Sequence, residues 1–164
     1  MALKANRIDY NLYNNIKIID NRVDKEIIGT KQFGKDQVII TNNQNLDFLI
    51  RRALIHHLSS NGLTIVNDKT LVISIENLEY SSTRGLPLGE SEVKLLLKAQ
   101  LISNKDGFKN YSKSYDIDLS SKNFIVSSPG RDRKNINLAL EEALQDIASD
   151  LTAIAGGANL INNE

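Results

Sequence analysis

The sequence predicts an α+β fold, in which a mostly antiparallel or mixed β-sheet carries two amphipathic helices packed on one face. Three observations support this prediction. Two stretches repeat apolar residues at the helical period, several others alternate them at the period of a strand, and a hairpin turn joins two long alternating stretches. Along the chain these segments run strands, helix, strands, helix. A helix between strands indicates a crossover connection, which is right-handed in nearly all proteins.

Three short strands are expected before the first helix. Asn15–Asp20 alternates apolar and polar residues and is rich in β-branched side chains. Glu26–Thr30 and Gln37–Thr41 have the same character, and Gly34 lies between them, where a turn is needed. The polar residues 21–24 separate the first strand from the second.

The first helix is predicted from an apolar stripe that follows a group of asparagines. Asn45 is suited to the N-cap because its side-chain oxygen can accept a free backbone N–H, and Gly62 is suited to the C-terminal end. Phe48 and Ile55 lie beside the stripe and widen it, so we expect this helix to be covered on more than one side. The stripe consists of residues spaced three and four apart: Leu46, Leu49, Ile50, Ala53, Leu54 and Leu58.

The middle of the chain is expected to contain a short strand, a longer strand and a loop. Leu63–Val66 is the short strand, and the alternation of the longer one runs from Leu71 to Ile75. After Asn77 the apolar residues change phase, which indicates a β-bulge; a sheet buried on both faces is the alternative. The composition of Ser81–Glu90 (SSTRGLPLGE) predicts a loop.

The second half combines a hairpin with a long helix. A half-buried strand over 93–101 and a return strand over 111–119 are joined by a turn at Asn104–Gly107. The last helix is expected from about Arg131 to Ala155, ended by Gly156 and Gly157. Its buried stripe is formed by Ile136, Leu140, Ala143, Leu144, Ile147, Leu151 and Ile154. Its solvent-facing side is expected to carry Glu141, Glu142, Gln145, Asp146 and Asp150.

The length of 164 residues fits one domain. We expect residues 1–15 to be a linker or arm, residues 16–156 to form the α+β domain, and residues 157–164 to be a C-terminal tail.

The composition excludes several kinds of chemistry. Twenty basic residues balance twenty acidic ones, so the basic excess typical of nucleic-acid-binding proteins is missing. The absence of cysteine excludes disulfides, thiolate metal sites and a cysteine nucleophile. No apolar run approaches the roughly 20 residues that span a bilayer, and the first fifteen residues lack an apolar signal core. We therefore expect a soluble chain, either native or with its export segment removed.

Two groups of side chains are weighed as candidates for metal binding or catalysis. His56 and His57 are adjacent on a helix and point about 100° apart, so a shared metal is disfavoured and His57 is expected beside the core stripe. Asp20 and Asp24 flank Arg22, and they form either a paired-carboxylate site or an ion pair and Asx-turn at the strand end, which we favour.

Two further groups are candidate binding sites. Arg131, Arg133 and Lys134 place basic side chains at the start of the last helix, where an anion could bind; a solvated cluster is the alternative. Arg84, Leu86, Pro87 and Leu88 form an apolar, glycine-flanked segment that either contacts a partner or folds back over the core.

No catalytic pattern is recognisable in the sequence. It contains no Ser/His/Asp arrangement, no metal-ligand spacing, no glycine fingerprint and no phosphate loop. We therefore predict a protein that is not an enzyme and that needs no cofactor.

Three stretches together carry a family resemblance. The first is IKIIDNRVDKEIIG (Ile16–Gly29), a strand followed by an acidic-x-Arg-x-Asp break. The second, Asn43–Val66, joins the amphipathic helix through a glycine to a strand. The third is YSKSY (Tyr111–Tyr115) together with NINLALEEALQDIASDL (Asn135–Leu151). Over roughly residues 16–152 the chain resembles the YajG-like family of bacterial envelope lipoproteins.

This resemblance implies a periplasmic domain that an acylated N-terminal cysteine tethers to the outer membrane. The sequence departs from the family in having no cysteine and no lipobox, so we expect that the export signal and anchor were removed. The resemblance implies no catalytic residues. It suggests a binding or assembly module with an envelope-protein partner; a carrier of small amphiphiles or lipids, with a cleft between helix and sheet, is the alternative.

Overall fold

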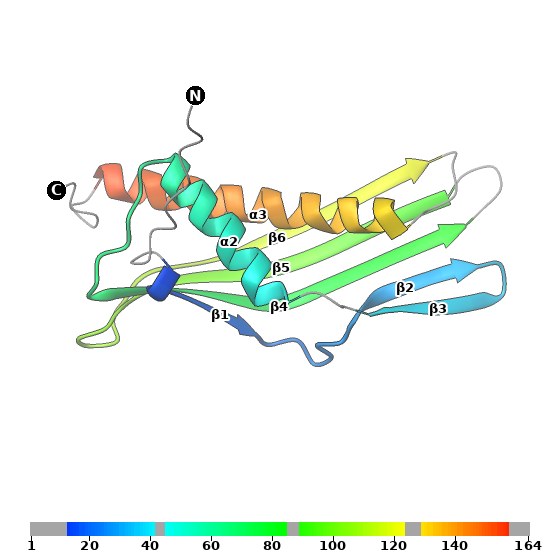
Figure 1. Cartoon of the computed structure of the whole chain (residues 1–164), viewed down its shortest axis with the longest axis horizontal. Helices are drawn as coiled ribbons and strands as arrows, with labels where there is room; N and C mark the ends of the chain where they lie inside the picture. The colour runs from blue at the N-terminus through cyan, green and yellow to red at the C-terminus, as the bar shows by residue number, and fades with distance from the viewer. Residues whose placement is uncertain (1–12, 42–44, 85–88, 124–128, 158–164) are drawn as a thin grey trace, which may run out of the picture.

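The computed structural model describes residues 13–41, 45–84, 89–123 and 129–157. It confirms the predicted α+β class, with six strands in one open sheet and two helices that lie across the same face (Figure 1). The strands are β1 (Ile16–Asp20), β2 (Ile27–Phe33), β3 (Asp36–Thr41), β4 (Lys69–Arg84), β5 (Gly89–Ser103) and β6 (Lys109–Asn123), and the helices are α2 (Leu46–Ser60) and α3 (Pro129–Gly157).

The long strand β4 organises the sheet. The strand order is β3-β2-β4-β5-β6, and β5 and β6 continue from β4 as an antiparallel meander. On its other edge β4 receives two parallel strands in succession, β1 over Leu71–Ile75 and β2 over Tyr80–Arg84. The register shifts between Ile75 and Asn77, which confirms the predicted bulge.

Helix α2 begins and ends as its sequence predicts. The side chain of Asn45 accepts the N–H of Phe48 at 3.2 Å, and Gly62 takes a φ of +70° just after the helix. The expectation that Phe48 widens the buried stripe is wrong, because this residue is 51% exposed, whereas Ile55 packs against the core as predicted. At 100° per residue, Phe48 points well over 90° away from the direction of the buried stripe. The residues buried by this stripe are Leu46, Ile50, Leu54 and Leu58.

Two predictions about the middle of the chain are wrong. Leu63–Val66 is not a strand in the described structure, although Leu63 and Ile65 are buried. The place beside β4 is taken by β1, and Asn15 donates its side-chain amide to the carbonyl of Ile65 at 3.1 Å. The predicted loop Ser81–Glu90 is mostly strand, because β4 continues through Arg84 and β5 begins at Gly89.

The core lies between the helices and the sheet. The inward residues of β5, from Val93 to Leu101, are buried as predicted, and so is the stripe of α3 from Ile136 to Leu151. The turn after β5 has Gly107 at a φ of +70°, in agreement with the predicted hairpin. Among the described residues, neither helix combines the length and apolar content that a membrane-spanning helix needs.

The end of the predicted N-terminal arm is attached to the fold. The carbonyl of Asn15 accepts the N–H of Leu71 at 2.8 Å, and the carbonyl of Tyr13 accepts a hydrogen bond from Arg51 at 3.0 Å. The rest of the predicted arm (residues 1–12) and of the tail (residues 158–164) lies outside the described residues.

Candidate functional site

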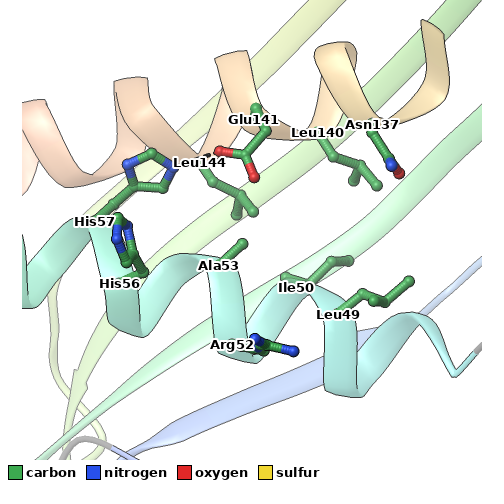
Figure 2. A pocket seen from close by; sticks show the side chains of 10 residues that line it. All are labelled: Leu49, Ile50, Arg52, Ala53, His56, His57, Asn137, Leu140, Glu141 and Leu144. Atoms are coloured by element: carbon green, nitrogen blue, oxygen red, sulfur yellow. Dashed lines mark hydrogen bonds and ion pairs between the residues drawn. The ribbon is translucent and has the colours of Figure 1, made fainter. Parts of the chain in front are cut away.

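A groove with a volume of about 470 Å³ lies between α2 and α3 (Figure 2). The two helices come close where His57 contacts Glu141, with 2.7 Å between Nε2 and Oε2, and they diverge toward the start of α2. The lining residues come from both helices: Leu49, Ile50, Arg52, Ala53, His56, His57, Asn137, Leu140, Glu141 and Leu144.

The groove has an apolar floor and polar rims. Leu49, Ile50 and Ala53 of α2 face Leu140 and Leu144 of α3 across it (Figure 2). The rim on α2 is basic through Arg52 and His56, whereas the rim on α3 carries the amide of Asn137 and the carboxylate of Glu141. Both Ile50 and Leu144 are almost fully buried, so the floor is continuous with the core. This volume and composition are those of sites that bind small molecules or peptide side chains.

The two histidines belong to the rim of this groove. Their rings meet edge to face with centroids 5.8 Å apart, and His57 is half-buried beside the core stripe, as predicted. Within the described ranges no group of three His, Asp or Glu side chains is placed to hold a metal ion.

The carboxylates after β1 have a structural role. Arg22 is buried and holds Asp20 through two hydrogen bonds, Nε to Oδ1 at 2.9 Å and Nη2 to Oδ2 at 2.8 Å. These bonds hold the pKa of Asp20 below its usual value. Asp24 accepts the backbone N–H groups of Glu26 and Ile27 at 3.0 Å each. The ion pair and Asx-turn favoured from the sequence are therefore both present.

The basic residues at the start of α3 surround a buried carboxylate. Arg133 and Lys134 are exposed and Arg131 is half-buried, whereas Asp132 between them is buried. Anion binding by the three basic residues stays a prediction.

The carboxylate of Asp132 joins α3 to the sheet. It accepts the hydroxyl of Tyr80 on β4 and pairs with the ammonium of Lys31 on β2. Burial raises the pKa of Tyr80, so its hydroxyl stays a donor. Burial also acts to lower the pKa of Lys31, and the facing carboxylate opposes that effect by favouring the charged ammonium. We call Asp132, Lys31 and Tyr80 the buried cluster.

A second polar group joins the other end of α3 to β6. One oxygen of Asp150 accepts hydroxyl hydrogen bonds from Tyr115 at 2.7 Å and Tyr111 at 3.3 Å, and it pairs with Lys113 at 2.5 Å. The hydrogen bond from Lys113, followed by that from Tyr115, holds the pKa of Asp150 below its usual value. Desolvation raises the pKa of both tyrosines. We call these four residues the rim cluster.

Asp150, predicted on the solvent-facing side of the helix, therefore lies at the edge of that side: its side chain is 34% exposed but contacts β6. Asp132 and Asp150 are eighteen positions apart, which is five turns of about 3.6 residues, so both carboxylates lie on the same side of the helix. That side is the edge of the apolar stripe and faces the sheet. The signal was available in the sequence as two acids at matching positions of the buried stripe.

The predicted partner-contact segment is described only at its start. Arg84 is the last residue of β4, and residues 85–88, which include Leu86, Pro87 and Leu88, lie outside the described residues. Its contact with a partner stays a prediction.

The fold and the groove define a class: an α+β domain with an open sheet, two helices on one face, and an apolar groove between the helices. A family model described as "Uncharacterized lipoprotein" matches residues 2–154, and the chain belongs to this family. Lipoproteins are attached to membranes of the cell envelope by a covalent lipid, which agrees with the lipoprotein resemblance of the sequence.

Solved structures support the fold. A predicted lipoprotein from Caulobacter crescentus has a TM-score of 0.52 at 13% identity, over 92% of this chain and 97% of that one. A protein from Xanthomonas campestris has a TM-score of 0.51 at 14% identity, over 83% of this chain and 78% of that one. At these identities the likeness is one of fold alone. A search of curated proteins finds no match.

Proposed function

We propose that this protein is a non-catalytic, YajG-like binding or assembly module, held by a lipid on the periplasmic side of the outer membrane. The observation that carries the proposal is the groove between α2 and α3. Its partner in this proposal is an amphipathic helix of an envelope protein.

The shape and chemistry of the groove suit a helix. Two diverging helices leave a V-shaped channel in which a third helix can bury an apolar stripe. The basic rim at Arg52 and His56 favours acidic residues on one flank of the partner helix. The acidic Glu141 on the opposite rim favours a basic residue on the other flank. This pattern of opposite charges would fix the direction in which the partner helix lies.

The described carboxylate clusters support a role without catalysis. Asp20 and Asp24 hold a turn, and Asp132 and Asp150 of α3 are engaged with partners from the sheet. General acid–base catalysis needs a carboxyl group that can reach a substrate. The acids that the sequence offered as candidates are used for structure instead.

A site-specific crosslinking experiment tests the groove. A photoreactive amino acid replaces Arg52 at the rim in the membrane-anchored product of the full gene, and cells are irradiated. We expect one discrete adduct, whose crosslinked peptide has an apolar stripe at helical spacing. The additional substitution Leu49→Glu places a charge in the floor and should abolish the adduct.

The matched control places the photoreactive residue at Leu138. This side chain is 50% exposed on α3 but does not line the groove. Equal adducts from positions 52 and 138, or an adduct that survives Leu49→Glu, would contradict a docking role for the groove.

The lipid anchor and the location need a separate test. Radiolabelled palmitate is fed to cells that express the full gene, and inner and outer membranes are separated. Label in the outer-membrane fraction is the expected result. An unlabelled product outside the membranes would contradict the location, whereas label in the inner membrane would correct the membrane assigned.

A carrier of small amphiphiles or lipids is the second candidate function. It needs a cleft between helix and sheet, and the cavity beside Leu58, Leu101 and Leu151 has only about 20 Å³, roughly the space of one water molecule. This cavity is too small for an acyl chain, whereas the groove is large enough for the side chains of a peptide. Native mass spectrometry that finds a bound lipid, together with a melting temperature raised by that lipid, would favour the carrier.

A further inference from the structure

The two strands at the ends of the strand order, β6 and β3, differ in how many charged residues they carry. β6, at one end, places Lys109, Lys113, Asp116 and Asp118 along its length, and charged side chains protect an edge against pairing with another chain. β3, at the other end, has no charged residue between Gln37 and Thr41. Of these two described edge strands, β3 is therefore the less protected.

The edge at β3 also exposes apolar side chains on both faces of the sheet. Val38 is paired with Lys31, which reaches Asp132 of α3, so Val38 lies on the face that carries the helices. Ile39 follows and lies on the opposite face. Their side chains are 49% and 58% exposed. An exposed apolar edge strand is a template for a further strand.

The hairpin geometry decides which backbone groups face outward. Gly34, with a φ of +62°, and Lys35 form a two-residue turn between Phe33 and Asp36. The residues that flank a two-residue turn are a hydrogen-bonded pair, so the peptide groups of Asp36 point toward β2. Along an antiparallel strand this direction alternates. The peptide groups of Gln37, Ile39 and Thr41 consequently point toward the free edge.

The segment from Gln37 to Thr41 is complementary to itself. Its order is polar, apolar, apolar, apolar, polar, and Ile39 is its centre. When two copies pair antiparallel about a two-fold axis through this centre, Ile39 lies opposite the second copy's Ile39. The same register sets Val38 opposite Ile40, and Gln37 opposite Thr41. The backbone groups that point outward are then the ones that meet.

We propose that β3 is a self-association site, through which two copies of this chain form one continuous sheet in this register. The two-fold arrangement is isologous, since the same five residues serve both copies. It joins apolar to apolar and polar to polar side chains, and none of the five residues is charged. The proposal does not depend on the groove, because the residues that line the groove all belong to α2 and α3.

Engineered cysteines test the register, because the chain contains no cysteine of its own. In Ile39→Cys the two thiols would lie on directly opposite residues, with Cα atoms about 5.5 Å apart, and a disulfide-linked dimer should form on mild oxidation. Val38→Cys is the control, because Val38 lies on the same strand and is similarly exposed. Its two copies would be diagonal neighbours more than about 7 Å apart, so the yield of disulfide-linked dimer should be several-fold lower.

Sedimentation equilibrium on the purified chain tests the association itself. We expect a reversible dimer whose dissociation constant rises at least about tenfold in Ile39→Lys, because two ammonium groups would meet at the centre. The control Leu138→Lys makes the same kind of change at an exposed leucine of α3 and should leave the dimer intact.

Three outcomes would overturn the proposal. They are a wild-type chain that is monomeric at every concentration, a dimer that survives Ile39→Lys, and equal crosslinking by the two cysteine variants. If the wild-type chain is monomeric but the Ile39→Cys variant forms a disulfide-free crosslink to another envelope protein in cells, the edge would be assigned to a strand of that protein instead. Circular dichroism of each variant separates loss of association from loss of folding.

Discussion

The two ends of α3 use the same chemistry at different depths. In the buried cluster, Asp132 receives a tyrosine hydroxyl and a lysine ammonium from the sheet, and the side chains of Lys31 and Asp132 are 11% and 7% exposed. In the rim cluster, Asp150 receives the same two kinds of donor, but the side chains of Lys113 and Asp150 are 51% and 34% exposed. Both clusters bind the helix to the sheet.

The difference in depth decides what each cluster contributes. In a buried ion pair, the attraction between the two charges offsets the free energy cost of removing them from water. Loss of one partner leaves the other charge buried with no attraction to offset that cost. A half-exposed pair keeps access to water, and loss of one partner removes mainly hydrogen bonds. We therefore expect the same substitution to have a several-fold larger effect in the buried cluster.

The largest effect is expected from Asp132→Ala. The change leaves the Lys31 ammonium buried without its carboxylate, which should lower the free energy of unfolding by about 3–5 kcal/mol. Urea denaturation followed by circular dichroism measures it. Glu142→Ala, at an exposed acid of the same helix, is the control and should change the stability by less than about 0.5 kcal/mol. A loss below about 1 kcal/mol for Asp132→Ala would show that water reaches Lys31.

The next largest effect is expected from Gly29→Ala, which acts on the buried cluster through the backbone. A Cβ at this position would overlap the carbonyl oxygen of Tyr80, so β2 must move away from β4 and carry Lys31 with it. We expect a loss of about 3 kcal/mol, at the upper end for overpacking. Gly130→Ala, where a Cβ meets nothing within 4 Å, should not destabilise the fold. Equal unfolding midpoints for the two variants would disprove this account.

A smaller effect is expected in the rim cluster. Asp150→Ala removes the acceptor of two tyrosine hydroxyls and of Lys113, but water can replace it, so the expected loss is about 1 kcal/mol. Asp146→Ala, one turn earlier and exposed, serves as the control in the same urea titration. A loss as large as that of Asp132→Ala would mean that depth does not separate the clusters.

The smallest effect is a dependence on pH. The folded pKa of Asp150 is below its unfolded value of about 3.9, so its contribution is complete above about pH 4 and is lost as the pH falls through the folded value. The stability deficit of Asp150→Asn should therefore be present at about pH 6 and shrink below about pH 4. Urea midpoints of wild type and variant across this range measure it. A deficit that is constant with pH would contradict a carboxylate role.

Much of the fold follows from local patterns, and the errors have physical causes. The hairpin of β5 and β6 and the stripe of α3 were predictable because their periods and turn residues agree. The extension of β4 through Arg84 was not, since polar residues such as Ser81 and Ser82 become strand only when β2 and β5 pair on both sides. Leu63–Val66 is the opposite case: it alternates like a strand but is not one, because β1 pairs with β4 instead.

The site was less predictable than the fold. The ion pair of Arg22 with Asp20 could be expected because its members are neighbours in the sequence. The groove depends on the angle at which α2 and α3 cross, and nothing local in either helix determines that angle. The buried cluster unites three elements, so its ion pair is invisible until the sheet has formed.

The two parallel strands that share one edge of β4 have a consequence for assembly. Ile16 pairs with Leu71, and Gly29 pairs with Tyr80. β1 and β2 are therefore synthesised well before β4, the strand with which they pair. The meander of β4, β5 and β6 closes through short connections and can form early, whereas distant pairings are slow. We therefore expect the pairings of β1 and β2 with β4 to form after the meander. Until β4 has been synthesised, the edges of β1 and β2 that it covers are unpaired and open to misassembly.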